Sequence, residues 1–298
     1  MKITLALTTF NNEKDIIDCL DAVIDQRIIK ASIIKVYDLG STDKTLDYLK
    51  QFSVELTSLD PNEYQLHHYT KVFNYIVNDN KECDILIHLS PFMVIDGSAI
   101  SEIFRLFLKF EDLALVYGRQ TPQVESSLIT KFCYRFNYPT TKKDLPYWHM
   151  HKVFCSFRFV AFRTKFLLED GILPPDNVDT FLDVYVSAKL NLKGYRTNYN
   201  PFAIAISNEN ITLSKIYKQT KFIYKFVNKN PWFNHRWNIR KNELAIFCDE
   251  MDAYIKEYST FPFYSLISYV CYLLCITAKY QANRECKQEY LKQESKKF

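Results

Sequence analysis

Short apolar runs that end in polar residues, each followed by a stretch with helical spacing, dominate the first two thirds of the chain. The runs 3–8 and 33–37 show little alternation of apolar and polar positions, which predicts strands buried on both faces of a parallel sheet. Between them, Ile16, Leu20 and Val23 share one face of an expected helix. Two parallel strands joined by a helix place their carboxyl ends on the same side of a sheet.

The same succession of apolar runs and helical stretches continues along the chain. We expect further strands at 54–56, 85–89, 113–117 and 154–163, and helices at 45–52, 68–77, 100–110, 182–193, 211–228 and 242–258. The sequence therefore predicts an α/β fold with two parts. Residues 1–210 form a mostly parallel sheet flanked by helices, and residues 211–298 form a helical C-terminal extension.

One uncharged segment, 258–278, is long enough to span a bilayer. It carries Ser, Thr and Pro near its start and several tyrosines, and basic residues follow it, which suits the membrane interface better than the membrane centre. Three interpretations stay open: a helix lying on the membrane surface, a buried packing helix, and a true span. The first makes the membrane surface an expected partner.

Composition narrows the class of protein. The chain has 298 residues, a net charge of +4 and 48% hydrophobic residues, so a large core is possible and the charge is too small to indicate a nucleic-acid partner. The eight cysteines contain no C-x-x-C pair, which favours reduced thiols in a cytoplasmic protein over a zinc site. The N-terminal run is too short for a signal-peptide core. We expect a cytoplasmic protein, peripheral on the inner face of the cell membrane.

Two loops after the first strands carry recognisable motifs. The segment 36–45, VYDLGSTDKT, places Asp38 at a strand end and Ser41 in the turn that follows. It resembles the D-x-G-S-T-D-x-T turn of family-two glycosyltransferases, and Thr9, Asn11 and Glu13 match the P-T-Y-N-x-E loop of the same family. The resemblance implies a GT-A fold, which is a Rossmann-like sheet, with these five residues binding the nucleotide of a nucleoside-diphosphate sugar.

Two later strings resemble one branch of that family. VYGRQTPQ supplies Gly118, Arg119, Gln120 and Pro122 of a G-R-Q-x-P motif, and 131–139 supplies F-N-Y-P. Both motifs are typical of the bacterial rhamnosyltransferase-like branch. The resemblance implies that Arg119 and Gln120 contact donor or acceptor; a planar guanidinium suits a diphosphate, although Arg119 could also pair with a structural carboxylate. Lys71 stands where the family often has a basic residue.

The catalytic base is expected at the start of the helix near 182. Inverting transferases of this fold take the proton of the acceptor hydroxyl with a carboxylate, and counting back from Gly194 puts Asp183 on that position. From the residue alone, an aspartate that stabilises the helix N-terminus through the dipole is the alternative. The polar loop 140–152, with Trp148, His149 and His151, is expected to cover the acceptor side; the H-x-H spacing there has no acidic or Cys partner in view.

The family's divalent metal lacks its ligands in this sequence. Phe92 stands where the D-x-D aspartate is expected, and Ser207-Asn208-Glu209 replaces H-S-H. Asp96 could substitute only if its loop folded back. We therefore expect no metal cofactor, with cations such as Arg119, Lys71, Arg158 or Arg163 stabilising the leaving diphosphate.

Two functions follow from this pattern. The first is an inverting, metal-independent glycosyltransferase that moves a sugar, with rhamnose suggested by the resemblance, onto a glycan or lipid-linked glycan. The second is a catalytically decayed relative that serves as a binding or scaffold protein in glycan assembly. A nucleotidyltransferase is disfavoured because no Gly-rich, Lys-bearing phosphate loop occurs.

Overall fold

The computed structural model describes residues 1–26, 32–64, 69–141, 154–176, 178, 181–233 and 262–294. Its elements are β1 (Ile3–Thr9), α1 (Ile16–Ile24), β2 (Ile33–Asp38), α2 (Thr45–Leu49), β3 (Glu55–Ser58), α3 (Tyr69–Asp79), β4 (Ile85–Leu89), β5 (Met93–Ile95), α4 (Ala99–Lys109), β6 (Leu113–Pro122), α5 (Leu128–Asn137), β7 (Phe159–Arg163), α7 (Thr164–Leu167), α8 (Leu182–Leu192), β8 (Arg196–Ser207), α9 (Leu213–Lys229) and α12 (Pro262–Glu294).

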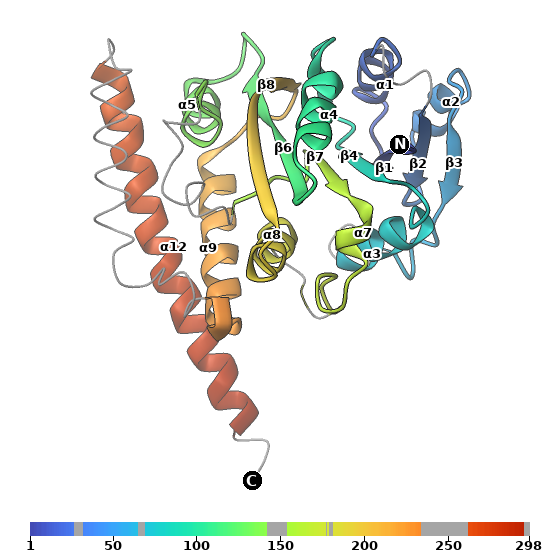
Figure 1. The fold of residues 1–298 in the computed structure, drawn as a ribbon. Helices are drawn as coiled ribbons and strands as arrows, with labels where there is room; N and C mark the ends of the chain where they lie inside the picture. The colour runs from blue at the N-terminus through green and yellow to red at the C-terminus, as the bar shows by residue number, and fades with distance from the viewer. Residues whose placement is uncertain are drawn as a thin grey trace. The chain divides into compact units, whose positions relative to one another are not determined.

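These elements form two compact units. The first comprises 1–125 and 138–209, and the second comprises 126–137 and 210–298. The first contains a mixed sheet with the order β3-β2-β1-β4-β7-β6-β8-β5 across its described residues (Figure 1). β1, β2, β3 and β4 pair in parallel, as do β6 and β8, whereas β7 runs antiparallel to β4 and β6, and β5 runs antiparallel to β8. The predicted α/β fold is confirmed.

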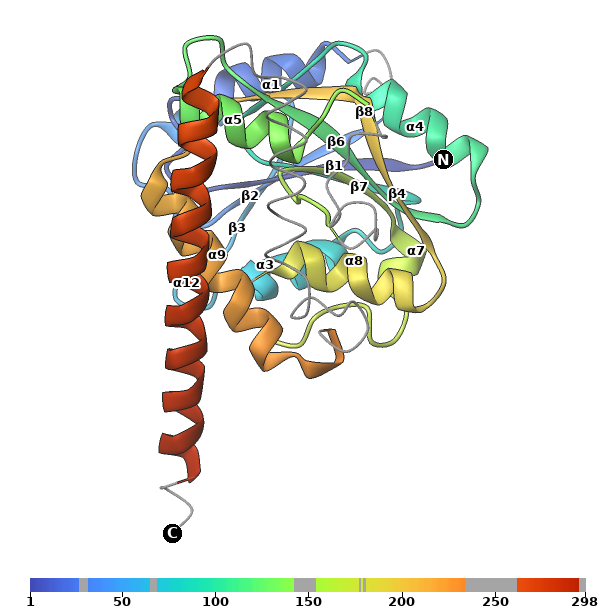
Figure 2. The ribbon, with the colours of Figure 1, turned by 90° about the vertical axis from the view of Figure 1, so that its left-hand side faces the viewer.

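Helices cover both faces of the sheet (Figure 2). On one face α1 and α4 pack on β1, β4 and β5 through a core that includes Leu5, Ile16 and Ile103. On the other face lies α3, where Phe73 meets Phe162 of β7 with the ring centroids 5.9 Å apart. Because both faces are covered, β1 and β4 are buried at every position. Burial on both faces explains their continuous apolar runs.

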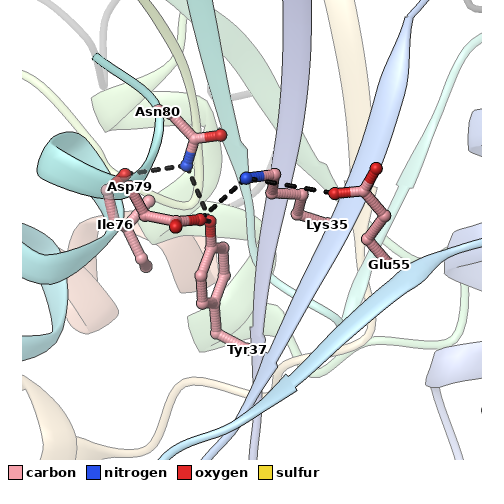
Figure 3. A network of polar contacts seen from close by, with 6 residues as sticks. All are labelled: Lys35, Tyr37, Glu55, Ile76, Asp79 and Asn80. Atoms are coloured by element: carbon pink, nitrogen blue, oxygen red, sulfur yellow. Dashed lines mark hydrogen bonds and ion pairs between the residues drawn. The ribbon is translucent and has the colours of Figure 1, made fainter. Parts of the chain in front are cut away.

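A polar network ties the end of α3 to β2 (Figure 3). The fully buried Tyr37 donates its hydroxyl to Asp79 at 2.7 Å and accepts from Asn80 at 2.7 Å. Lys35 adds an ion pair to the same carboxylate at 2.8 Å. Burial opposes ionisation of Asp79, but the hydrogen bonds from Lys35 and Tyr37 prevail and hold its pKa below the usual value. The network fixes α3 beside the strands that carry the first two loops.

In the second unit, α9 runs alongside α12 (Figures 1 and 2). Asn228 donates to Asn283 at 2.8 Å, and Glu285 pairs with Lys221 at 2.5 Å and Lys225 at 2.6 Å. Across the described residues, no helix has the length and apolar character that crossing a bilayer requires.

Candidate active site

Most of the predicted site residues gather at one edge of the sheet. Thr9 and Asp38 are register partners at the carboxyl ends of β1 and β2. β4 ends beside them at Leu89, which pairs with the first residue of the antiparallel β7, Phe159. The loops after β1, β2 and β4 and the segment before β7 therefore meet at this edge. Open α/β sheets bind their ligands outside the carboxyl ends of such strands.

Hydrogen bonds join the loop after β1 to the loop after β2. Asn11 adopts a left-handed backbone with φ of 54°, and its side-chain oxygen accepts from the Thr42 amide at 2.8 Å and the Asp43 amide at 3.3 Å. The Asn11 amide in turn donates to the Ser41 hydroxyl at 2.9 Å. The Glu13 amide donates to Asp43 at 3.1 Å. The two motifs thus form a single structural unit, and the left-handed backbone of a non-glycine residue is a strain that often marks a functional site.

The Asp38 carboxylate closes its own turn. It accepts hydrogen bonds from the Gly40 amide at 2.9 Å, the Ser41 amide at 3.0 Å and the Ser41 hydroxyl at 2.5 Å, and the residue is buried. Gly40 has φ of 86°, and an added Cβ would lie 3.2 Å from Pro61. The turn therefore needs glycine at this position and a hydrogen-bond acceptor at Asp38.

The G-R-Q string spans a bulge in β6, where register with β8 shifts between Gly118 and Arg119. A Cβ on Gly118 would lie 2.3 Å from the Phe159 ring and 2.6 Å from the Ala203 carbonyl, so only glycine fits there. The Arg119 Nε atom is buried without a hydrogen-bond partner in the described structure. Its positive charge is close enough to Tyr199 to oppose the rise in pKa that burial causes there. The Tyr199 hydroxyl donates to the Pro139 carbonyl at 2.7 Å. Arg119 thus has a donor left for a ligand.

The segment 155–158, just before β7, connects the separate parts of the site. The Gln120 amide donates to the Ser156 hydroxyl at 2.7 Å, which ties the segment to β6. The Arg158 carbonyl accepts from the Ser90 amide at 2.9 Å, which ties it to the end of β4. Phe157 packs on Phe73 of α3, with the ring centroids 4.7 Å apart.

Asp183 lies half-buried in the first turn of α8, next to this segment. Its carboxylate accepts hydrogen bonds from the backbone amides of Val184, at 2.9 Å, and Phe157. Burial raises the pKa of Asp183 to about 6, although these amides and the Arg158 charge oppose the shift. The residue that precedes the helix, Phe181, has a left-handed backbone with φ of 61°. A carboxylate with a pKa near neutrality suits general-base chemistry.

Sequence reasoning missed a buried polar chain beneath Asp183. His88 in β4 makes a short contact from Nδ1 to the Phe157 carbonyl, and its Nε2 lies 2.5 Å from the Tyr69 hydroxyl, which also contacts Thr8 at 3.0 Å. Burial lowers the pKa of His88 to about 4, so the ring is neutral at pH 7. Because a carbonyl only accepts, Nδ1 carries the proton and Nε2 accepts from Tyr69. The three side chains Thr8, Tyr69 and His88 thus hold the peptide carbonyl of Phe157, whose amide binds Asp183.

The positions that correspond to the family's metal ligands do not suit a divalent cation. Glu209 pairs with the Arg158 guanidinium at 2.5 Å, and the same guanidinium lies 5.6 Å from the Phe92 ring centroid. Asn208 donates to Asp15 at 2.9 Å. Divalent cations of this kind require several oxygen ligands, whereas here a phenyl ring and a carboxylate already paired with arginine occupy the positions. Within the described ranges no cluster of three or more His, Cys, Asp or Glu could hold a metal.

The remaining predicted residues make no hydrogen bond or ion pair with the site residues above among those that the structure describes, or they lie outside the described residues. Asp96 does not fold back, because its carboxylate binds Ser98 at 2.9 Å at the start of α4. Lys71 is half-buried in the first turn of α3, with no contact to the other predicted site residues in the described structure. The expected acceptor loop with Trp148, His149 and His151 lies outside the described residues, as do the first four residues of the segment 258–278.

Comparison with known proteins links the chain to two bacterial transferases; no family model matches it. The O-antigen chain rhamnosyltransferase RfbN of Salmonella typhimurium is 27% identical over 241 residues, which cover 78% of this chain and 74% of that protein. The O-antigen chain rhamnosyltransferase WbaN of Salmonella anatum is 25% identical over 203 residues, or 66% of this chain and 63% of that protein.

Two solved structures show the same fold. The mannosyltransferase PcManGT from Pyrobaculum calidifontis, in complex with GDP-Man and Mn²⁺, has a TM-score of 0.64 at 13% identity and covers 94% of this chain and 86% of its own. The S. aureus TarS fragment in complex with UDP-GlcNAc has a TM-score of 0.52 at 14% identity, with 97% and 92% covered.

Proposed function

We propose that this chain, a glycosyltransferase with the GT-A fold related to bacterial O-antigen rhamnosyltransferases, transfers rhamnose from a nucleoside diphosphate to a lipid-linked glycan with inversion at the anomeric carbon. The likeness to RfbN and WbaN supports rhamnose and an O-antigen type of acceptor. The nucleotide would lie on the joined loops after β1 and β2. Thr9, Asn11, Glu13, Asp38 and Ser41 shape that surface.

The observation that carries the proposal is Asp183. It is a half-buried carboxylate whose pKa desolvation raises to about 6, and a residue with a left-handed backbone precedes its helix. A sugar hydroxyl is a poor nucleophile at neutral pH unless a base removes its proton during attack. An aspartate that served only as a helix cap would sit in solvent with a low pKa. The raised pKa of Asp183 therefore favours the base over the cap.

In the proposed reaction one bond to the anomeric carbon forms and one breaks. The acceptor oxygen attacks the anomeric carbon and its proton passes to Asp183, while the bond from that carbon to the donor phosphate oxygen breaks. The electron pair leaves on the nucleoside diphosphate. Attack from the side opposite the leaving group inverts the configuration. Asp183 releases its proton to solvent before the next turnover.

We further propose that turnover needs no divalent metal, because the residues at the family's ligand positions offer one carboxylate that is engaged with Arg158. The test is a transfer assay with rhamnose donors carrying uracil, thymine or guanine and a lipid-linked glycan acceptor. Activity that persists in EDTA supports the proposal. Activity that EDTA abolishes and Mn²⁺ restores contradicts metal independence. Donor binding without any transfer or hydrolysis would instead favour the binding or scaffold protein.

We propose that the second unit binds a membrane surface, where a lipid-linked acceptor would be available. Exposed apolar and aromatic side chains on α9 and α12 support this, namely Phe222, Tyr269, Leu273 and Tyr280. In sedimentation with anionic vesicles, the Tyr269→Ser/Leu273→Ser variant should bind several-fold more weakly. The exposed Leu108 of α4 offers a control, since Leu108→Ser should bind as the wild type does.

A further inference from the structure

We propose that Arg158 supplies the positive charge that stabilises the leaving diphosphate, in the place that a divalent metal takes in relatives. This inference rests on the proposed function. It names one residue for a role that several cations could play, and its support is the position of Arg158 among the other groups of the site.

Arg158 lies between the two positions where metal ligands are missing. Its guanidinium pairs with Glu209 after β8 and lies against the ring of Phe92 after β4. The same side chain is close enough to Asp183 for its charge to lower the pKa of that carboxyl. Arg158 is therefore near the proposed base, at the edge where the donor would lie. Its side chain is about a quarter exposed, so a ligand can reach it.

The other candidate cations are placed differently. Arg163 lies at the opposite end of β7 and donates to the carbonyls of Phe107 and Leu113 at 2.9 and 3.2 Å, which gives it a structural role. Lys71 is in the first turn of α3 and makes no hydrogen bond or ion pair among the described residues. Arg119 lies in β6, beside Tyr199. Arg158 contacts both Phe92 and Glu209, and among the described residues no such pair of contacts is seen for the other three cations.

A guanidinium suits this role chemically. Its planar donors match two phosphate oxygens at once, and it stays charged throughout turnover. When the bond from the anomeric carbon to the phosphate oxygen breaks, the electron pair adds negative charge to the diphosphate. A preorganised cation beside those oxygens stabilises that charge without changing its own protonation state.

Glu209 gives the proposal a second, independent consequence. Its carboxylate pairs with the guanidinium at 2.5 Å and would therefore compete with a phosphate for the same donors. Its negative charge also repels a diphosphate. Removing the charge of Glu209 should therefore strengthen diphosphate binding, whereas removing the charge of Arg158 should weaken it. If the salt bridge served only folding, the two substitutions would not change diphosphate affinity in opposite directions.

The experiment measures binding of inorganic pyrophosphate, and of UDP, dTDP and GDP, by calorimetry in EDTA. Arg158→Ala should lower pyrophosphate affinity by about tenfold or more, as expected for a lost charged hydrogen bond. The pyrophosphate affinity of Arg158→Lys should lie between those of the wild type and Arg158→Ala, and Glu209→Gln should raise the affinity a few-fold. The exposed pair of α4 offers matched controls, because Arg105→Ala and Glu102→Gln remove the same charges elsewhere.

The outcomes separate this inference from the function on which it rests. If the wild type binds none of these probes, the proposed function fails. If the wild type binds them but Arg158→Lys and Glu209→Gln bind equally well, the inference fails and the function stands. If Arg158→Ala does not fold, the Lys and Gln variants decide alone, since each keeps a side chain of similar size. Pyrophosphate affinity that rises tenfold on adding Mn²⁺ would also overturn it.

Discussion

Replacing Asp183 by asparagine should stabilise the protein at pH 7 and abolish transfer. The substitution keeps the size of the side chain and one acceptor oxygen for the Val184 amide, and it removes the charge. A residue selected for folding does not behave in this way. A base with a raised pKa does, because its charged form is needed for chemistry and is unfavourable for stability.

The magnitude follows from the pKa of Asp183. Burial raises it from 3.8 to about 6 in the folded state. Above pH 6 the unfolded chain gains the full benefit of ionisation, while the folded chain must ionise a half-buried group. Below pH 4 both states are protonated and the penalty disappears. The difference between the two values corresponds to roughly 3 kcal/mol at pH 7. Asparagine brings an amide that needs a partner of its own, so we expect a gain of about 1 to 3 kcal/mol.

Urea unfolding at pH 7 and at pH 4 measures this gain, which should be present at the first pH and nearly absent at the second. Transfer by Asp183→Asn should fall by about 10² to 10⁴. The wild-type transfer rate should drop about tenfold for each pH unit below pH 6, because the base is then protonated. The charged or titratable groups that face this carboxyl are Arg158 and Cys155, and neither titrates in that range.

A matched control is Asp79→Asn in the network of Figure 3. The pKa of Asp79 is held low by Lys35 and Tyr37 despite partial burial, so its charged form stabilises the fold above the unfolded pKa. This variant should lose stability at pH 7 and lose less as the pH falls. The reasoning on Asp183 is refuted if Asp183→Asn also loses stability at pH 7, as a helix-capping aspartate would by about 0.5 to 2 kcal/mol.

Three further substitutions test the fold and the nucleotide loops. Gly118→Ala should cost about 1 to 3 kcal/mol in urea unfolding, because its Cβ would meet Phe159 at 2.3 Å and a backbone carbonyl at 2.6 Å. Tyr37→Phe should cost about 1 to 3 kcal/mol by the same measurement, since it removes the hydroxyl that donates to Asp79 and leaves one N–H of the Asn80 amide without an acceptor. Asp38→Ala should weaken nucleoside binding in calorimetry about tenfold by releasing its turn; unchanged affinity would mean that this loop does not bind the nucleotide.

Strands buried on both faces were the easiest elements to predict. The bounds of β4, Ile85–Leu89, match the expectation, and β1 differs from it by one residue. The segment 154–158 was predicted as part of the strand 154–163. In the structure β7 begins at Phe159. The earlier residues turn their polar groups to Gln120, His88 and Asp183 instead, and these partners are far away in sequence.

The joined loops after β1 and β2 were predictable because their motifs are local, whereas the centre of the site was not. His88 stands inside the apolar run ILIHL, so its role is visible only when Tyr69 is placed 2.5 Å from it. Arg158 and Glu209 meet because β7 is inserted between β4 and β6, an order that no local pattern encodes.

The proposed metal independence and the proposed base, Asp183, have a common structural basis. The segment 155–158 contacts several parts of the site: Ser156 binds Gln120 of β6, the Phe157 amide binds Asp183, and the Arg158 side chain contacts Phe92 and Glu209. A guanidinium at this position would disfavour a metal by its charge and by engaging the Glu209 carboxylate. A decayed site would have no reason to keep a carboxylate whose raised pKa costs stability. The arrangement therefore favours a changed way of stabilising the leaving group over a lost activity.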